Sequence, residues 1–232
     1  MPRTQPIKTN KRAIIAIHGW TGNAESLNSL SKQWRFLETN WIFIEGPYKA
    51  KPKGFSWFNG NDQDGWEYEK SFDILNYTIQ NLIENGYQHK NIFMLGFSQG
   101  ACLAMEFIIK QEFSIGGIIP ISGFIKNKSY FKKEENILSK DTAVLLIHGE
   151  KDHIINAKES RIAFKLFMDL GYKTDLYIFK GGHKIPIKAK RKGMSYTDTP
   201  SYERKRKAGE KKVNEFKDGF KIFLYMIKRF FK

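Results

Sequence analysis

The 232-residue sequence contains a single cysteine, Cys102, and no long hydrophobic run. One cysteine cannot form an intrachain disulfide, which favours a reducing compartment. A membrane-spanning helix needs a run of roughly 18 apolar residues, and since none occurs we expect no transmembrane helix. Residues 1–12 are polar and basic and have no apolar core of a secretory signal. We therefore expect a cytoplasmic protein.

Acidic residues are scarce: 24 Asp and Glu stand against 39 Lys and Arg, a formal net charge of +15. A field of this sign favours anionic partners. The excess is concentrated in residues 184–212, which hold eleven basic and three acidic residues. We expect this segment to be a solvated loop or to contact an anionic membrane surface. Nucleic-acid binding is the least favoured interpretation, because few aromatic residues lie between the basic ones.

The remaining composition is that of a globular protein, with 41% hydrophobic, 27% charged and 15% aromatic residues. The length predicts one domain over residues 1–232. Within it, residues 188–209 form a basic insertion with little apolar content. Residues 210–232 carry apolar side chains at helical spacing and predict a C-terminal helix.

Short apolar runs alternate with longer segments of helical periodicity, a pattern typical of βαβ units. Several of the runs are apolar at every position, which indicates a mostly parallel sheet with helices on both faces. The fold class is therefore α/β. Residues 46–66, rich in Gly, Pro, Asn and aromatics, predict a long loop. Strands are predicted at 13–17, 41–45, 91–97, 115–121, 143–147 and 174–179, and helices at 23–40, 67–85, 101–111 and 156–170.

The segment Gly96–Gly100 (GFSQG) matches the G-x-S-x-G nucleophile elbow. In an elbow the serine lies on a sharp strand-to-helix turn, and the two glycines let the strand and the helix approach closely. An apolar strand ends at Phe97 and a helix of small residues follows, which is the required context. The alternative is a glycine-rich turn with a surface serine. We predict that Ser98 is a nucleophile.

A serine hydroxyl needs an adjacent base, and histidine is the usual one. In this type of fold the base follows the serine and the acid in the chain, which excludes His18 and His89. His183 lies in the segment GGHKIP after the last predicted strand, where a flexible loop can reach the serine. The alternative for His183 is an ordinary surface residue. We predict His183 as the base.

The base in turn needs a carboxylate to orient it. Asp152 follows the predicted strand 143–147, at the edge of the sheet where Ser98 is expected, because parallel strands end on one side. Asp141 and Asp175 precede or begin strands and belong to the opposite edge. Glu150 remains a second possibility. A helix-capping role is the alternative for Asp152.

Hydrolysis also needs two N–H donors for the oxyanion. The backbone N–H of Gln99 is expected to supply one, and that of Trp20, in the loop after the first strand, the other. The long loop also carries three aromatic residues, Trp57, Phe58 and Trp66, which we expect either to wall the substrate pocket or to pack over the sheet. We expect Cys102 to be a small core residue.

Taken together, the HG loop at residues 18–19, GFSQG, HGEKDHIIN at 148–156 and GGHKIP resemble the phospholipase/carboxylesterase family. This family includes acyl-protein thioesterases and small carboxylesterases. The resemblance covers roughly residues 13–186. One departure is Asn59, where the family usually has Asp after a Trp-Phe pair.

The resemblance implies an α/β-hydrolase fold and cleavage of carboxylic esters or thioesters through an acyl-enzyme, without a metal or an organic cofactor. It implies Ser98 as nucleophile, Asp152 as acid and His183 as base, with Trp20 and Gln99 as oxyanion donors. Two other classes remain open. One is a non-catalytic or weakly catalytic binding module on a hydrolase scaffold, which docks to anionic surfaces through residues 184–212. The other is a peptidase or a dienelactone-type hydrolase, and the latter resembles this fold but has cysteine at the elbow.

Overall fold

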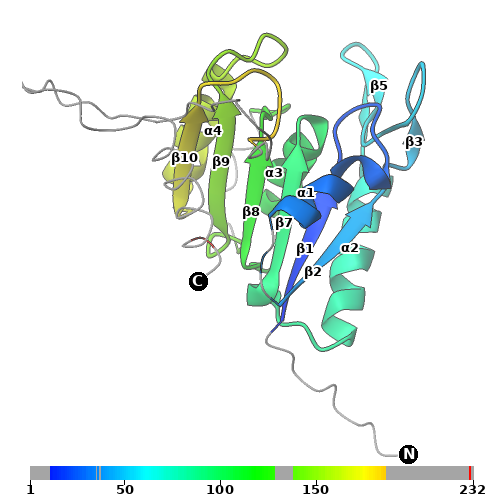
Figure 1. The fold of residues 1–232 in the computed structure, drawn as a ribbon, viewed down its shortest axis with the longest axis vertical. Helices are drawn as coiled ribbons and strands as arrows, with labels where there is room; N and C mark the ends of the chain where they lie inside the picture. Colours follow the sequence, from blue (N-terminus) through cyan, green and yellow to red (C-terminus); the bar gives the residue numbers. More distant parts are fainter. Residues whose placement is uncertain (1–10, 35, 37, 129–137, 187–229, 231–232) are drawn as a thin grey trace, which may run out of the picture.

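A six-stranded sheet, parallel throughout, forms the centre of the molecule (Figure 1). The computed structural model describes residues 11–34, 36, 38–128, 138–186 and 230. The order of the strands is β10-β9-β8-β7-β1-β2, which confirms the predicted α/β fold with a mostly parallel sheet. The strands are β1 (Arg12–Ile17), β2 (Thr39–Ile44), β7 (Ile92–Phe97), β8 (Gly117–Ile121), β9 (Ala143–Gly149) and β10 (Thr174–Phe179).

Helices cover both faces of this sheet (Figure 1). The larger apolar cluster lies on the face packed by α2 (Glu69–Glu84), α3 (Gln99–Ile109) and α4 (Lys158–Asp169). The smaller cluster lies on the opposite face, under η1 (Ala24–Leu27) and α1 (Asn28–Gln33). A further single turn, η2 (His89–Asn91), leads into β7.

Strand β1 shows why the apolar runs predict buried strands. Ala13, Ile15 and Ile17 point into the larger cluster, whereas Ile14 and Ala16 point into the smaller one. All five are at most 2% exposed. Because side chains alternate across a strand, a strand between two layers of helices must be apolar at every position.

The structure corrects the predicted helix over residues 23–40. Leu27, Leu30 and Trp34 are buried as the helical spacing indicates, but α1 ends at Gln33 and β2 begins at Thr39. Trp34 leaves helical geometry with φ −90° and ψ 53°. The chain must turn there because β2 runs parallel to β1 directly beside it.

The predicted long loop over residues 46–66 contains two short antiparallel hairpins. The first pairs β3 (Tyr48–Lys49) with β4 (Phe55–Ser56), and the second pairs β5 (Asn59–Asn61) with β6 (Gly65–Glu67). An additional bridge joins Gly22 to Phe55, which ties the first hairpin to the loop after β1.

The basic insertion 188–209 lies outside the described residues, and so does all of the predicted helix 210–232 except Phe230. The proposed membrane contact through 184–212 likewise falls outside them, apart from residues 184–186. Phe230 is helical and packs against Phe93, with ring centroids 5.9 Å apart. Among the helices that the structure describes, none has the length and apolarity needed to cross a membrane.

The chain passes from β1 to β2 on one side and later returns to β7 on the other side of β1. At such a switch the loops after the two central strands diverge, which opens a crevice at their carboxyl ends. The loops after β1, β7, β9 and β10 all lie at this edge, at the top of Figure 1. Trp20, Ser98, Asp152 and His183 lie in these loops, and Gln99 begins the helix that follows β7.

Candidate active site

Ser98 lies at a sharp turn between β7 and α3. It is the single residue between Phe97, the last of the strand, and Gln99, the first of the helix. Its φ is 53° and its ψ is −115°, a backbone conformation that side-chain-bearing residues rarely adopt. Its N–H donates to the carbonyl of Ile121 on β8 at 2.9 Å. The turn thus presents the hydroxyl at the carboxyl edge of the sheet, as the elbow predicts.

The two glycines of the elbow are required by close approaches between backbones. A Cβ at Gly96 would lie 2.3 Å from the carbonyl oxygen of Gly100, and a Cβ at Gly100 would lie 2.3 Å from that of Ile17. Contacts this short with backbone atoms cannot be relieved by rotating a side chain. The glycines therefore let β7, α3 and β1 meet directly below Ser98.

The structure brings Ser98, His183 and Asp152 into one hydrogen-bonded chain. The Nε2 of His183 lies 3.0 Å from the Oγ of Ser98, and its Nδ1 lies 2.7 Å from the Oδ2 of Asp152. The ring of His183 also packs against Phe97, with centroids 5.0 Å apart. Glu150, the alternative acid, is exposed. A hydroxyl, an imidazole and a carboxylate linked in this order have the geometry that nucleophilic catalysis by a serine requires.

Backbone hydrogen bonds between the loops after β9 and β10 place Asp152 beside His183. Glu150 donates to the carbonyl of Phe179 at 2.7 Å, and Lys151 donates to that of Gly181 at 2.8 Å. A Cβ at Gly149 would lie 2.3 Å from the carbonyl oxygen of Gly182. Gly149 therefore lets the loop after β10 lie directly on the end of β9.

Asp152 is held as a carboxylate by the turn that follows it. Its Oδ1 accepts the backbone N–H groups of Ile154 and Ile155, both at 2.9 Å. Burial raises the pKa of Asp152, but the hydrogen bonds from Ile155 and His183 outweigh it, so the pKa lies below its ordinary value. An ionised acid is what the base needs in order to keep its proton on Nδ1.

His18 orients the loop that is expected to supply an oxyanion donor. Its Nε2 accepts the N–H of Gly46 at 3.1 Å, so the ring proton is on Nδ1 and is donated to the carbonyl of Gly19 at 2.7 Å. That carbonyl also accepts the N–H of Gly22 at 3.0 Å. Because the C=O and N–H of one peptide point in opposite directions, the N–H of Trp20 points away from this turn.

The same loop lies against the nucleophile. A Cβ built on Gly19 would be 3.3 Å from the Cβ of Ser98. The second expected donor, the N–H of Gln99, belongs to the first turn of α3, where helical N–H groups have no intrahelical partner. Both expected donors are thus next to Ser98.

The side chain of Gln99 joins the elbow to the first hairpin, a contact that sequence reasoning missed. Its Oε1 accepts the N–H of Trp57 at 2.9 Å, and its Nε2 donates to the Oγ of Ser56 at 2.9 Å. The indole N–H of Trp57 donates to the carbonyl of His18 at 2.8 Å. These residues are about 40 positions apart, so no local pattern could have indicated the contacts.

The aromatic residues expected to wall the substrate pocket divide into two groups. Trp57 and Phe58 are 0% and 4% exposed and belong to the core. They lie inward because the hairpins fold onto the sheet, and the indole of Trp57 packs against the ring of His18 in a tilted arrangement, with centroids 4.8 Å apart. Trp66 is half-buried, and its ring centroid lies 3.3 Å from the ammonium of Lys126.

The comparisons with known proteins identify the family. A family model described as Phospholipase/Carboxylesterase matches residues 4–197. The chain belongs to the phospholipase/carboxylesterase family. As a member of this family the protein is a hydrolase.

Proteins similar in sequence to this chain include acyl-protein thioesterases. The chain is 29% identical over 187 residues to acyl-protein thioesterase 1 homolog 2 of Dictyostelium discoideum, covering 73% of this chain and 83% of the relative. It is 29% identical over 188 residues to acyl-protein thioesterase 1 of Kluyveromyces lactis, covering 73% and 82%. A probable inactive carboxylesterase of Oryza sativa is 26% identical over 192 residues, covering 75% and 78%.

Solved structures share the fold. SOBER1 of Arabidopsis thaliana superposes with a TM-score of 0.71 at 17% identity, covering 96% of this chain and all of the other. Esterase PE8 superposes with a TM-score of 0.70 at 21% identity, covering 97% and 96%. These two structural similarities confirm that the protein has the α/β-hydrolase fold.

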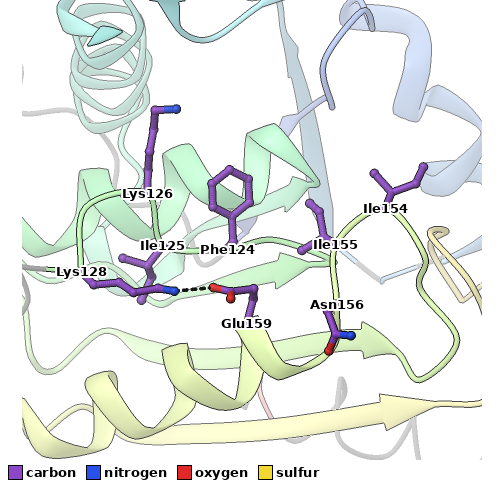
Figure 2. A pocket seen from close by; sticks show the side chains of 8 residues that line it. All are labelled: Phe124, Ile125, Lys126, Lys128, Ile154, Ile155, Asn156 and Glu159. Carbon is purple, nitrogen blue, oxygen red and sulfur yellow. Dashed lines mark ion pairs between the residues drawn. The ribbon is translucent and has the colours of Figure 1, made fainter. Parts of the chain in front are cut away.

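The protein has a pocket beside Asp152, between the loops that follow β8 and β9, with a volume of about 560 Å³ (Figure 2). Figure 2 shows that four of the lining residues come from the loop after β8 and four from the loop after β9 and the first turn of α4. Lys128 and Glu159 form an ion pair at 2.9 Å across it. The lining residues are Phe124, Ile125, Lys126, Lys128, Ile154, Ile155, Asn156 and Glu159.

Two large apolar side chains are exposed in the loops at this edge. Trp20, after β1, is 59% exposed, and Ile154, two residues after Asp152, is 74% exposed. Within the described part of the chain, no group of three or more His, Cys, Asp or Glu side chains has the arrangement of a metal site.

Proposed function

We propose that the protein hydrolyses carboxylic esters or acyl thioesters, with Ser98 as nucleophile, His183 as general base and Asp152 as the acid that orients it. The observation that carries the proposal is the hydrogen-bonded chain from Ser98 through His183 to Asp152, at 3.0 and 2.7 Å. Family membership alone does not decide activity, because one relative is named a probable inactive carboxylesterase. Ser98, His183 and Asp152 are all present and in contact in this chain.

Acylation begins at the Oγ of Ser98. Asp152 accepts a hydrogen bond from the N–H at Nδ1 of His183. The proton stays on Nδ1, so the lone pair of Nε2 faces the hydroxyl of Ser98. As Oγ attacks the carbonyl carbon, its proton passes to Nε2, and the carbonyl oxygen becomes an oxyanion that the N–H groups of Trp20 and Gln99 stabilise. His183 then returns the proton to the alcohol or thiol, which leaves, and Ser98 carries the acyl group.

Deacylation reuses the same groups. Water replaces the leaving group, and His183 accepts its proton while the oxygen of the water attacks the acyl carbon. The tetrahedral intermediate collapses to a free carboxylic acid, and the proton on Nε2 returns to the Oγ of Ser98. The free enzyme is restored with no cofactor consumed.

The surroundings of the nucleophile favour an apolar acyl or leaving group. The exposed side chains of Trp20 and Ile154 offer apolar surface at the edge where Ser98 lies. The pocket beside Asp152 adds Phe124, Ile125 and Ile155. Trp66 is the one residue of the expected aromatic wall that reaches this region, through Lys126.

The first experiment compares Ser98→Ala with wild type on p-nitrophenyl acetate, on matched acyl thioesters and on a chain-length series of both. We expect Ser98→Ala to lower kcat by about 10⁴- to 10⁶-fold and to abolish labelling by a fluorophosphonate probe. Ser122→Ala is the matched control: Ser122 also has a positive φ, of 51°, at the carboxyl end of a strand, but it is fully buried. Wild-type turnover in Ser98→Ala would overturn the proposal.

A further inference from the structure

His148 is a second imidazole on the acid of the proposed triad. It is the penultimate residue of β9 and is 0% exposed. Its Nε2 lies 2.8 Å from the carbonyl oxygen of Ile155 and 3.3 Å from the Oδ2 of Asp152. The same Oδ2 accepts from His183 at 2.7 Å. The carboxylate oxygen that serves the base therefore lies between two histidine rings.

The contacts of His148 define which of its nitrogens carries the proton. Nε2 faces two oxygens that can only accept, the carbonyl of Ile155 and the carboxylate of Asp152, so Nε2 must donate. Burial lowers the pKa of His148, so the ring is neutral near pH 7. In a neutral ring, Nδ1 is then an acceptor, and the Oγ of Ser160 lies 2.6 Å from it.

Ser160 therefore fixes the tautomer. Its hydroxyl, in the first turn of α4 and 1% exposed, donates to Nδ1 of His148 and keeps the proton on Nε2. If the proton moved to Nδ1, a lone pair on Nε2 would face the Oδ2 of Asp152 and the carbonyl of Ile155. That arrangement is repulsive in a buried site.

We propose that His148, held by Ser160, is a positioning residue that orients Asp152 and limits its basicity. The N–H of its Nε2 shares the charge of Oδ2 with His183 and holds the carbonyl of Ile155, so the turn after Asp152 is fixed at both its carboxylate and its backbone. This inference rests on the proposed triad. His148 itself touches neither the substrate nor Ser98.

The pH dependence follows from the same contacts. The ionisable groups that act on His148 in the described part of the chain are Asp152 and His183. When the N–H of His148 is removed, only His183 interacts with the negative charge of Oδ2, and this favours the protonated, inactive form of His183. The acid limb of the kcat/KM profile should therefore move to higher pH.

The test compares His148→Leu with His148→Gln, because the glutamine amide can place an N–H near the position of Nε2 whereas leucine cannot. We expect His148→Leu to lower kcat for p-nitrophenyl acetate by about 10- to 100-fold, because it removes both the hydrogen bond to the carbonyl of Ile155 and the N–H that lies beside the charged Oδ2 of Asp152. KM should change little, and the acid limb should shift to higher pH. His148→Gln should recover most of kcat and the wild-type profile.

Ser160→Ala tests the inference without changing the buried ring, and it decides the matter if His148→Leu does not fold. We expect it to lower kcat about 3- to 10-fold, because Nε2 then donates only part of the time. Ser139→Ala is the matched control: Ser139 is 0% exposed and bonds to Ile108 and Tyr172, away from the triad. It should lose stability but keep kcat.

The outcomes separate the inference from the proposed function. If Ser98→Ala abolishes turnover but Ser160→Ala keeps wild-type kcat, and His148→Leu is no different from His148→Gln, only the role of His148 is overturned. If Ser98→Ala retains turnover, the triad itself is wrong. A loss in Ser160→Ala that Ser139→Ala does not share, with a shifted profile in His148→Leu, supports the inference.

Discussion

Replacing Asp152 by asparagine removes one charge and changes few atoms, and the structure predicts how the new amide will lie. Oδ1 of Asp152 accepts two backbone N–H groups, from Ile154 and Ile155, both at 2.9 Å. Only the carbonyl of an asparagine can occupy that position, so its NH₂ group must face His183. A donor facing Nδ1 of His183 forces the ring proton onto Nε2, which then cannot accept the proton of Ser98.

The size of the effect follows from that wrong tautomer. The equivalent change in a serine protease lowers kcat about 10⁴-fold, and we expect a loss of about 10³- to 10⁴-fold here, or about 4–5 kcal/mol of transition-state stabilisation. Stability should change less, by about 1–2 kcal/mol, because the two backbone hydrogen bonds are kept and only the contact of Oδ2 with the N–H of His148 at 3.3 Å is lost. The variant therefore separates catalysis from folding.

Purified Asp152→Asn and wild type would be compared by p-nitrophenyl acetate hydrolysis at pH 7.5 and by urea unfolding. The control is Glu150→Gln, which removes the same charge two residues earlier from an exposed side chain that sequence reasoning left as the alternative acid. It should stay within about twofold of wild type, since an exposed charge contributes little. A folded Asp152→Asn within tenfold of wild type, or a larger loss in Glu150→Gln, would refute the reasoning.

Two further predictions concern the framework around the site. Gly100→Ala should destabilise the fold by about 3 kcal/mol and abolish activity, because its Cβ would lie 2.3 Å from the carbonyl oxygen of Ile17. The control is Gly171→Ala: Gly171 has a φ of +85° but open space around it, so the variant should lose only about 1 kcal/mol in urea unfolding and keep kcat. Burial raises the pKa of Glu106, so this carboxyl stabilises the fold below its unfolded pKa, and that contribution is lost as the pH rises through its folded pKa. Glu106→Gln does not titrate, so the unfolding free energy of the variant relative to wild type should be higher at pH 8 than at pH 4. An equal difference between variant and wild type at both pH values would contradict the assignment.

Much of the fold was predictable because its signals are local. A strand buried on both faces must be apolar at every position, so β1, β7 and β9 are visible as short apolar runs. The elbow is equally local, since Gly96, Ser98 and Gly100 lie within five residues and their types follow from one turn. Predictions failed where local pattern and packing disagree: the spacing of Leu27, Leu30 and Trp34 suggested a helix to residue 40, but the return to β2 ends it at Gln33.

The sequence by itself determined the α/β class and the elbow motif around Ser98, because both depend on residue types within a few positions. Chain order and the direction of parallel strands predicted His183 and Asp152 as the partners of Ser98, with Glu150 left as an alternative acid. The tertiary structure alone decided that Trp57 and Phe58 are core residues, and that Gln99 and His148 have partners beyond their local pattern. Such contacts depend on how the hairpins, loops and helices pack. The burial of a side chain in a loop and a hydrogen-bond partner far along the chain leave no periodic trace in the sequence.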